Sequence, residues 1–428
     1  MKKYRKNPAA PAVVCAGLCA LLCLLTACGG QSSGGTDTQP PREIETVDLI
    51  DDRAFTDTSA LESRFTDAFS AASPVPEADV TFTLTDAGVC VTGYTGGETV
   101  VVIPDTLGGS PVTAVAEGAF KDAPMQALCL PESVTAIGRG ALEGCTSLST
   151  LKAPVFTCPD ADWFGALFGS ASYEINRANV PSTLKTLILT GSTAQSVPDY
   201  CFYGCTGLEA VSLPAGVTAV GDFAFYGCDR LTVVSLPAGL KTVGDYAFGN
   251  CLSLLSLTVP ASAERLGRSM LEGCRALESL TVPFVGMTAD DGWLGLLFGA
   301  VDHTFSEGYV PASLIRVTVT AGTSLPANAF FECSGIREVI LPDTLTSIGH
   351  RAFYRCARLA SVTLPASVTS LSDEAFCGCV RLTSVDLSHV TSLGVQVFRG
   401  CSSLSDVIPP ACGVPAYTFE GTPYGLTH

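Results

Sequence analysis

Apolar and polar positions recur along the chain with a fixed period. From Leu213 the segment LPAGVTAVGDFAFYGCDRLTVVS is followed directly by LPAGLKTVGDYAFGNCLSLLSLT, and related segments begin at Leu341 and Leu364. Each unit of 23 residues carries a Leu-Pro pair, a Val-Thr run that usually ends in Gly, an Ala-Phe-x-x-Cys run and a Leu-x-x-Val run. Such a period is typical of stacked units that bury their apolar side chains against their neighbours. The pattern predicts a solenoid with a core that is continuous along its axis.

Positions within a unit predict its local structure. Val234 and Leu236 are spaced like the inward residues of a short strand, and Pro237 ends that strand because it has no N–H to donate. Gly221 is expected to allow a backbone turn. The Ala-Phe pair that ends at Phe225 offers one small and one large apolar side chain, which predicts a short helical turn that closes each coil.

These units resemble the BspA-like leucine-rich repeats of bacterial surface proteins over about residues 79–428. The segment TFTLTDAGVCVTGYTGGETVVVIPDTLGGSPVTAVAEGAF is similar to the start of such arrays. The resemblance implies an α/β repeat fold: a right-handed leucine-rich-repeat solenoid with a parallel strand ladder and short helical turns. A hairpin cap is expected over 79–102 and repeats over 103–428. Exposure on the cell surface, and binding to macromolecules of a host or a neighbouring cell, are further implications of the resemblance.

Two units are lengthened by matching inserts, near residues 153–190 and 283–322. DADWFGALFGS around Trp163 and DDGWLGLLFGA around Trp293 lie 130 residues apart, so the array contains a larger repeat. The spacing of Trp163, Leu167 and Phe168 indicates one face of a helix that packs on the side of the solenoid. Both tryptophans are also candidate aromatic anchors for a ligand. The acidic residues before them favour helix capping over a calcium site, which needs more oxygen ligands: Asp160, Asp162, Asp290 and Asp291.

The N-terminus has the three parts of an export signal. A basic stretch precedes an apolar run over residues 12–25, and Leu25-Thr26-Ala27-Cys28 follows. This arrangement resembles a bacterial lipoprotein signal, which implies cleavage after residue 27 and acylation of the Cys28 thiol as a membrane anchor. The alternatives are an ordinary signal peptide in which Cys28 is incidental and an uncleaved membrane helix. The apolar run is short for a membrane span.

Residues 28–78 form a predicted flexible, acidic linker. They are rich in Gly, Ser, Thr, Pro and acidic residues, a composition that buries too little apolar area to fold. Leu61, Phe65 and Phe69 follow a possible capping box at helical spacing, which predicts one short amphipathic helix within the linker.

Charge and composition narrow the class of partner. Hydrophobic residues make up 47% of the chain and charged residues 15%, with a formal net charge of −17. An acidic surface repels phosphate backbones, so nucleic acid is not an expected partner. The export signal and the family resemblance imply a protein that works outside the cytoplasm at the bacterial cell envelope and meets proteins or glycans there.

Nine cysteines occupy one repeat position, at the end of the Ala-Phe-x-x-Cys run. We predict buried, reduced thiols there, as at the Asn/Cys position of leucine-rich repeats. Disulfides between neighbouring coils remain an alternative, because coils stack about 5 Å apart. No metal site is expected, since no histidine lies near a cysteine pair. The nine are Cys145, Cys205, Cys228, Cys251, Cys274, Cys333, Cys356, Cys379 and Cys401.

Catalytic groups are not arranged in any recognisable motif. The histidines His303, His350, His389 and His428 are scattered, and there is no nucleophile elbow, phosphate-binding glycine loop or H-E-x-x-H motif. We expect a protein that is not an enzyme, without cofactor, metal or small-molecule substrate.

The outward positions of the predicted strands form a second candidate surface, rich in hydroxyl groups. Such a row can hydrogen-bond a glycan or an extended protein, although Ser and Thr also suit any exposed strand. The candidate ligand face consists of Ser212, Ser235, Thr258, Thr281, Thr363 and Asp386. Its companion row, also expected to face outward, consists of Ala210, Val233, Ser256, Ser279, Ser361 and Ser384.

Two functional hypotheses follow from these features. The first is a lipid-anchored surface protein that mediates binding or adhesion to an extracellular protein or glycan, such as a host matrix protein or another cell. The second is a structural or accessory envelope protein that binds the cell's own polysaccharide or a partner lipoprotein.

Overall fold

The computed structural model describes residues 69, 71–154, 157–191, 196–289 and 292–427. The chain divides into two compact units, residues 1–51 and 52–428, and all described residues belong to the second. The predicted signal, Cys28, most of the linker and Asp290 with Asp291 lie outside the described residues. No helix in the described part is long and apolar enough to cross a membrane.

A small curled sheet covers the N-terminal end of the solenoid. β1 and β2 form an antiparallel hairpin, and β2 continues into the repeats by pairing in parallel with β5. Val89 and Val91 on β2 are fully buried, so the hairpin closes the apolar core at this end. The predicted hairpin is therefore found. The elements are η1 (Glu77–Asp79), β1 (Val80–Thr85), β2 (Gly88–Tyr94), β4 (Thr106–Leu107), β5 (Ser110–Val115) and β7 (Ala136–Ile137).

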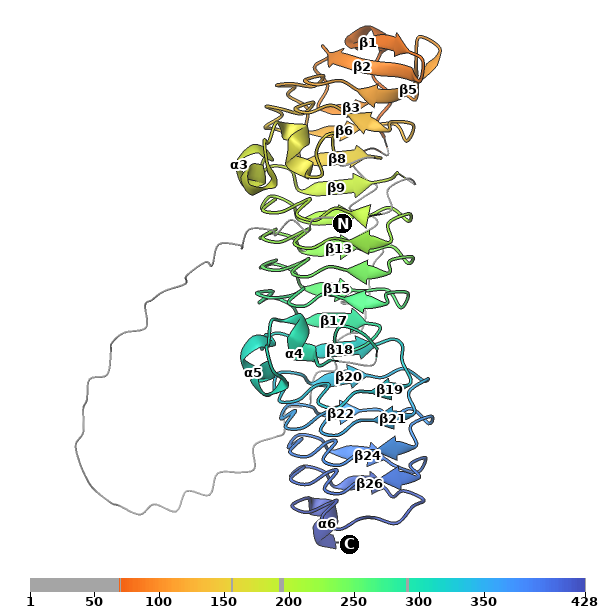
Figure 1. Cartoon of the computed structure of the whole chain (residues 1–428), viewed down its shortest axis with the longest axis vertical. Coiled ribbons are helices and arrows are strands. Elements are labelled where there is room, and N and C mark those ends of the chain that lie inside the picture. Colours follow the sequence, from red (N-terminus) through yellow and green to blue (C-terminus); the bar gives the residue numbers. More distant parts are fainter. Residues whose placement is uncertain (1–68, 70, 155–156, 192–195, 290–291, 428) are drawn as a thin grey trace, which may run out of the picture. The chain divides into compact units, whose positions relative to one another are not determined.

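One short strand from each coil joins a parallel ladder, which forms the column of arrows in Figure 1. Equivalent residues pair in register, as Leu257 does with Leu280. The parallel solenoid predicted from the 23-residue period is confirmed. Its strands are β3 (Val100–Val102), β6 (Ala127–Cys129), β8 (Thr150–Ala153), β9 (Thr186–Leu189), β11 (Ala210–Ser212), β13 (Val233–Ser235), β15 (Ser256–Thr258), β17 (Ser279–Val282), β18 (Arg316–Val319), β20 (Glu338–Ile340), β22 (Ser361–Val362), β24 (Ser384–Asp386) and β26 (Asp406–Ile408).

The Val-Thr runs form a second ladder of two-residue strands, also parallel. The second residue of each strand is buried, as Val220 and Val243 are, except Leu393 of the last strand, which is partly buried. The strands are β10 (Ser196–Val197), β12 (Ala219–Val220), β14 (Thr242–Val243), β16 (Arg265–Leu266), β19 (Ser324–Leu325), β21 (Ser347–Ile348), β23 (Ser370–Leu371) and β25 (Ser392–Leu393).

The glycine that follows this second ladder has a different role from the one expected. Gly221 does not adopt a positive φ. A Cβ atom placed there would lie 2.6 Å from the backbone nitrogen of Asp199 on the preceding coil. Glycine is therefore required because adjacent coils approach closely, rather than because the chain turns at this position.

The third side of the coils is the turn that contains the Ala-Phe pair. Stacked phenylalanines fill the core beneath this turn. Phe225 lies between Phe202 and Phe248, with ring centroids 4.9 Å and 5.3 Å away and nearly parallel ring planes. The second half of the array repeats this arrangement from Phe330 to Phe419. The chain around each ring forms a hydrogen-bonded turn, not the short helix expected at Phe225, because its amide groups bond to the next coil.

The residue before each Ala-Phe pair has a left-handed backbone conformation. Phe223 and Tyr246 both have a φ of 55°, as does Arg351 in the second half. This conformation is uncommon for side chains larger than Gly or Asn. It persists because it directs the amide of Phe223 to the carbonyl oxygen of Asp245 on the next coil, at 2.9 Å.

The buried cysteines form a ladder of hydrogen bonds between coils. The Cys228 thiol donates to the carbonyl oxygen of Phe202 at 3.2 Å, and Cys251 donates to that of Phe225 at 3.3 Å. Cys145, Cys274, Cys356, Cys379 and Cys401 make the same bond at 3.0–3.1 Å. The predicted burial of these thiols is confirmed. The carbonyl oxygens of Phe202 and Phe225 also accept the amide of the cysteine in their own turn, so the thiol of the next coil supplies a second hydrogen bond.

Replacing Phe225 by Ala removes one ring from the middle of the stack. We expect the free energy of unfolding to fall by about 3–5 kcal/mol, because a buried aromatic side chain leaves a cavity. Chemical denaturation monitored by circular dichroism measures this loss. Tyr417→Ala is the control, since Tyr417 is 64% exposed in a turn of the last coils. An equal effect of the two changes would contradict the assignment of the core.

Candidate binding surfaces

The parallel ladder brings the predicted ligand face into one row along the solenoid. Ser212 pairs with Ser235, and Thr258 pairs with Thr281. Thr363 directly follows β22, and β24, which contains Asp386, lies next to β22. Ser235, Thr258, Thr363 and Asp386 are exposed, and Ser212 and Thr281 are partly exposed. We call these six residues the strand lane.

The strand lane differs from the expectation in three respects. Thr318 pairs with Thr281 and therefore lies in the same row as the strand lane. It is absent from the predicted ligand face because the second insert interrupts the repeat before it. Ile340 occupies the same row and is 44% exposed, so the row is not hydroxylated throughout. The expectation that Ala210 and Val233 face solvent is wrong. They are buried because they pair directly and their apolar side chains cover each other.

The first insert holds Trp163 in place by polar contacts. The indole Nε1 donates to the carbonyl oxygen of Ser170 at 3.2 Å, and the Arg139 guanidinium lies 5.5 Å from the ring centroid. Arg139 also donates to Ser170, at 3.0 Å. Trp163 packs partly buried against the core. Most of its apolar surface is thus used within the protein, and only part of the ring remains for a ligand.

The helix predicted in this insert is much shorter than expected. Only a 3-10 helix forms, and Trp163 precedes it, so the three predicted residues do not share one helix face. The amide of Phe164 bonds instead to the carbonyl oxygen of Cys201 on the neighbouring coil. No side chain caps this helix, and Asp160 pairs with Arg139 at 3.4 Å, which corrects the capping expectation. The helical segments are η2 (Phe164–Phe168), η3 (Tyr173–Ile175) and α3 (Asn176–Asn179).

The second insert has helical segments in the same order, which confirms the larger repeat. Trp293 again precedes the first of them, and its ring meets His303 edge-on with centroids 6.1 Å apart. The buried Trp293 Nε1 has no hydrogen-bond partner among the described atoms. Figure 1 shows α3 and α5 on the same side of the strand column. The segments are α4 (Leu294–Leu297), η4 (His303–Phe305) and α5 (Ser306–Tyr309), and a last helix, α6 (Pro423–Thr427), lies at the far end.

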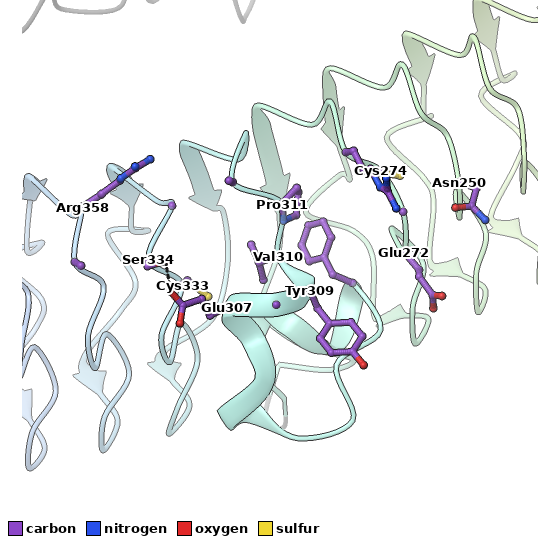
Figure 2. Close-up of a pocket in the computed structure, with 17 residues that line it drawn as sticks. Asn250, Glu272, Cys274, Glu307, Tyr309, Val310, Pro311, Cys333, Ser334 and Arg358 are labelled. Atoms are coloured by element: carbon purple, nitrogen blue, oxygen red, sulfur yellow. Dashed lines mark hydrogen bonds between the residues drawn. The ribbon is translucent and has the colours of Figure 1, made fainter. Parts of the chain in front are cut away.

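A pocket of about 620 Å³ lies beside α5, where the second insert interrupts the turns of successive coils (Figure 2). Its lining includes Arg275 and Arg358, and neither has an ion-pair partner in the part of the chain that the structure describes. Glu307 accepts a hydrogen bond from Ser334 at 3.1 Å, and Tyr309 is 45% exposed at the rim. The pocket thus offers charged, polar and aromatic groups next to the starts of β17, β18, β20 and β22. We call it the second-insert pocket.

A second row of aromatic rings lies on the outside of the turns, above the buried phenylalanines. Tyr200, Phe223 and Tyr246 stack with centroids 5.0 Å and 4.8 Å apart, and their ring planes are within 8° of parallel. Tyr203 and Tyr226 stack beside them at 5.4 Å. Tyr173, from the first insert, lies 4.4 Å from Tyr200 and extends the row. We call these six partly exposed rings the aromatic face. Five of the six rings follow the 23-residue spacing of the repeats, a signal that is visible in the sequence.

The repeats match a known family. The sequence model described as "BspA type Leucine rich repeat region" matches residues 113–187, 179–288 and 323–423, more than half of the chain. The chain belongs to this family. No curated protein matches it.

Solved leucine-rich-repeat structures are also similar to this BspA-type chain. One is a leucine-rich repeat protein from Bacteroides ovatus, 21% identical, covering 77% of this chain and 92% of its own, with a TM-score of 0.40. A leucine rich cell surface protein from Faecalibacterium prausnitzii is 22% identical over 82% and 99%, with a TM-score of 0.35. The Pneumococcal vaccine antigen PcpA is 20% identical over 82% and 85%, with a TM-score of 0.29. At these identities the likeness concerns the fold alone.

The thiols of this BspA-type array are poor nucleophiles and poor metal ligands. Burial raises the pKa of Cys145 to about 11 and that of Cys274 to about 12. All cysteines in the described ranges are free, and no group of three His, Cys, Asp or Glu side chains there is placed to hold a metal. Their chemistry is therefore that of core side chains.

The raised thiol pKa values predict that stability falls in alkaline solution. An unfolded thiol loses its proton near pH 8.5, whereas Cys145 and Cys274 keep theirs to about pH 11 and 12. The contribution of these protonated thiols to the free energy of unfolding is complete below about pH 8.5. It is lost as the pH rises through the pKa values of the folded protein. Urea midpoints measured between about pH 8 and 11 should decrease, and Cys228→Ser should reduce the slope by removing one titrating thiol. A midpoint that rises with pH would contradict this account.

Proposed function

We propose that the protein is a bacterial surface protein whose solenoid binds an extracellular macromolecule, either a protein or a glycan. The observation that carries the proposal is the row of parallel strands, which presents Ser235, Thr258 and the other residues of the strand lane side by side along successive coils. Repeat solenoids characteristically use such extended faces for binding. An elongated ligand can contact many coils at once, so modest contacts at each coil add up.

The distribution of polar groups favours binding over catalysis. Apolar side chains fill the interior, and the histidines lie apart in the described coils, with His303 packed edge-on against Trp293 and Phe331. A catalytic site needs a nucleophile or acid next to an orienting partner in a cleft. The second-insert pocket holds Glu272 and Glu307, the latter bonded to Ser334, but no histidine lines it. Burial raises the pKa of its thiols, Cys274 and Cys333. Its groups are suited to hydrogen-bonding and ion-pairing with a ligand.

The display of the solenoid at the cell surface rests on the N-terminal signal. Cleavage after residue 27 would leave Cys28 at the new N-terminus, where acylation of the thiol anchors the chain. The following Gly, Ser and Pro-rich segment is long enough to hold the repeats away from the membrane. The envelope thus places the repeats where extracellular proteins and glycans are accessible.

Cys28→Ala removes the proposed acylation site. We expect the full-length variant to appear in the soluble fraction of lysed or washed cells, because acyl chains supply about 0.8 kcal/mol of membrane binding per buried CH₂ group. Fractionation with immunodetection measures the shift. Retention of Cys28→Ala in the membrane fraction, with unchanged signal cleavage, would contradict the anchor.

The binding proposal is tested with the intact protein on arrays of matrix proteins and glycans. We expect retention on at least one extracellular ligand. The double variant Ser235→Lys, Thr258→Lys should weaken that binding about 10-fold or more if these residues lie in the interface. Ala238→Lys, in the turn beyond β13, is the matched control and should bind normally. Retention only on the cell's own polysaccharide would favour the accessory envelope role, and turnover of an array ligand would contradict both roles.

A further inference from the structure

The aromatic face is not needed to build the fold. Buried phenylalanines stack in both halves of the array, whereas the double outer row, Tyr200–Phe223–Tyr246 beside Tyr203–Tyr226, lies in the coils that follow the first insert. The described second half carries a shorter outer stack, Phe331 on Tyr354, and Tyr417 in its last coils. In the second half, Asn328 and Arg351 occupy the positions of Tyr200 and Phe223, with φ values of 61° and 55°. The same backbone therefore accepts polar side chains there. This position is accessible to solvent and tolerates polar residues. Aromatic rings placed there indicate a role in recognition.

The rings are held ready for contact. Tyr200 and Phe223 are within 3° of parallel, and Tyr203 and Tyr226 are within 7°. The Tyr226 hydroxyl accepts a hydrogen bond from Asn250 at 2.7 Å. Side chains fixed in this way lose little conformational entropy on binding, which is why tyrosine is common in binding surfaces.

Carboxylates run along the aromatic face. Asp199 and Asp222 immediately precede Tyr200 and Phe223, and each uses one oxygen to accept a backbone N–H of the next coil, at 2.7 Å. The second oxygen of each remains for another partner. Burial, then the neighbouring Tyr173 phenol, then Asp199 and Asp222 raise the pKa of Tyr200, which shows that these charges act on the ring.

The cations around the aromatic face leave two of its carboxylates unpaired. Arg177 lies 3.8 Å from Asp229, and Arg265 lies 3.9 Å from Asp245. No ion pair to Asp199 or Asp222 occurs among the described residues. The surface therefore combines the edges of stacked rings with uncompensated negative charge, in a chain whose net charge is −17.

We propose that the aromatic face, with Asp199 and Asp222, docks an extended segment of a partner protein that is rich in arginine and lysine. The carboxylates pair with the cations of such a segment, while the apolar stems of its Arg and Lys side chains pack along the ring edges. This chain itself places arginines against a ring, since Arg351 and Arg355 lie 5.3 Å and 5.2 Å from the ring centroid of Tyr354. The negative field of the whole chain steers a basic segment toward the site.

The proposal deepens the proposed binding function and rests on it. Fluorescence anisotropy with the full-length protein tests it directly, using a labelled peptide of repeated Gly-Arg-Gly-Lys units and a matched peptide with Glu in place of the basic residues. We expect the basic peptide to bind, more weakly as salt is raised, and the acidic peptide not to bind. Failure of the basic peptide, beside retention of the protein on an array ligand, would overturn this site and leave the general binding function intact.

Single substitutions distinguish the contribution of the rings to peptide affinity from that of the carboxylates. Tyr200→Asn introduces the residue that the second half carries at this place, and should weaken peptide binding about 10-fold. Phe223→Arg, equally compatible with the backbone, should abolish it by placing a cation in the site. Asp222→Asn keeps the acceptor for the backbone amide and should weaken binding with a shallower salt dependence. Tyr417→Asn, at the same repeat position in the last coils, is the control that should bind normally.

Two outcomes would overturn the proposal. One is wild-type affinity in both Tyr200→Asn and Phe223→Arg, which would place the peptide elsewhere. The other is displacement of the peptide by a neutral oligosaccharide at comparable concentration, which would make the aromatic face a glycan site. Unfolding of Tyr200→Asn would leave Phe223→Arg as the deciding variant, with circular dichroism as the check on its fold.

Discussion

The close stacking of one coil on the next is the constraint on which the rest of this structure depends. No coil has a core of its own, so an interior ring such as Phe225 is covered by the rings of its two neighbours, and thiols such as Cys228 bond to an adjacent coil. Positions that face the neighbouring coil are therefore mostly apolar or small, such as the phenylalanines, the strand valines and leucines, the cysteines and Gly221. At Gly221 even a Cβ atom would collide with the coil before it.

The same constraint decides where extra residues can be added. The first insert lies between β8 and β9, yet Ala153 still pairs with Leu189 across it. The second lies between β17 and β18, where Val282 still pairs with Val319. Both inserts loop out on the turn side and leave the ladder unbroken. New surface chemistry arises where coil stacking leaves side chains free, namely in the inserts, the strand lane and the outer turn positions.

Features that follow from the period could be predicted from the sequence. The strands, the buried phenylalanines and the buried cysteines recur every 23 residues, so each copy supports the others. Features that depend on a particular neighbour could not. The amide of Phe164 is bonded to Cys201 of a neighbouring coil, and the short helical segment begins there, so Trp163 stays outside it. Ala210 is buried because Val233 happens to pair with it, and the second-insert pocket exists only through the placement of α5 against four other coils.

Native-state hydrogen exchange tests the central claim, that the coils are stabilised mainly by their neighbours and act as one stacked unit. Backbone amides that bond between coils should be most protected in the interior, around Phe225 and Phe353, with protection that declines gradually toward both ends of the repeats. Exchange of a single interior coil as fast as the terminal coils, while its neighbours stay protected, would contradict the account.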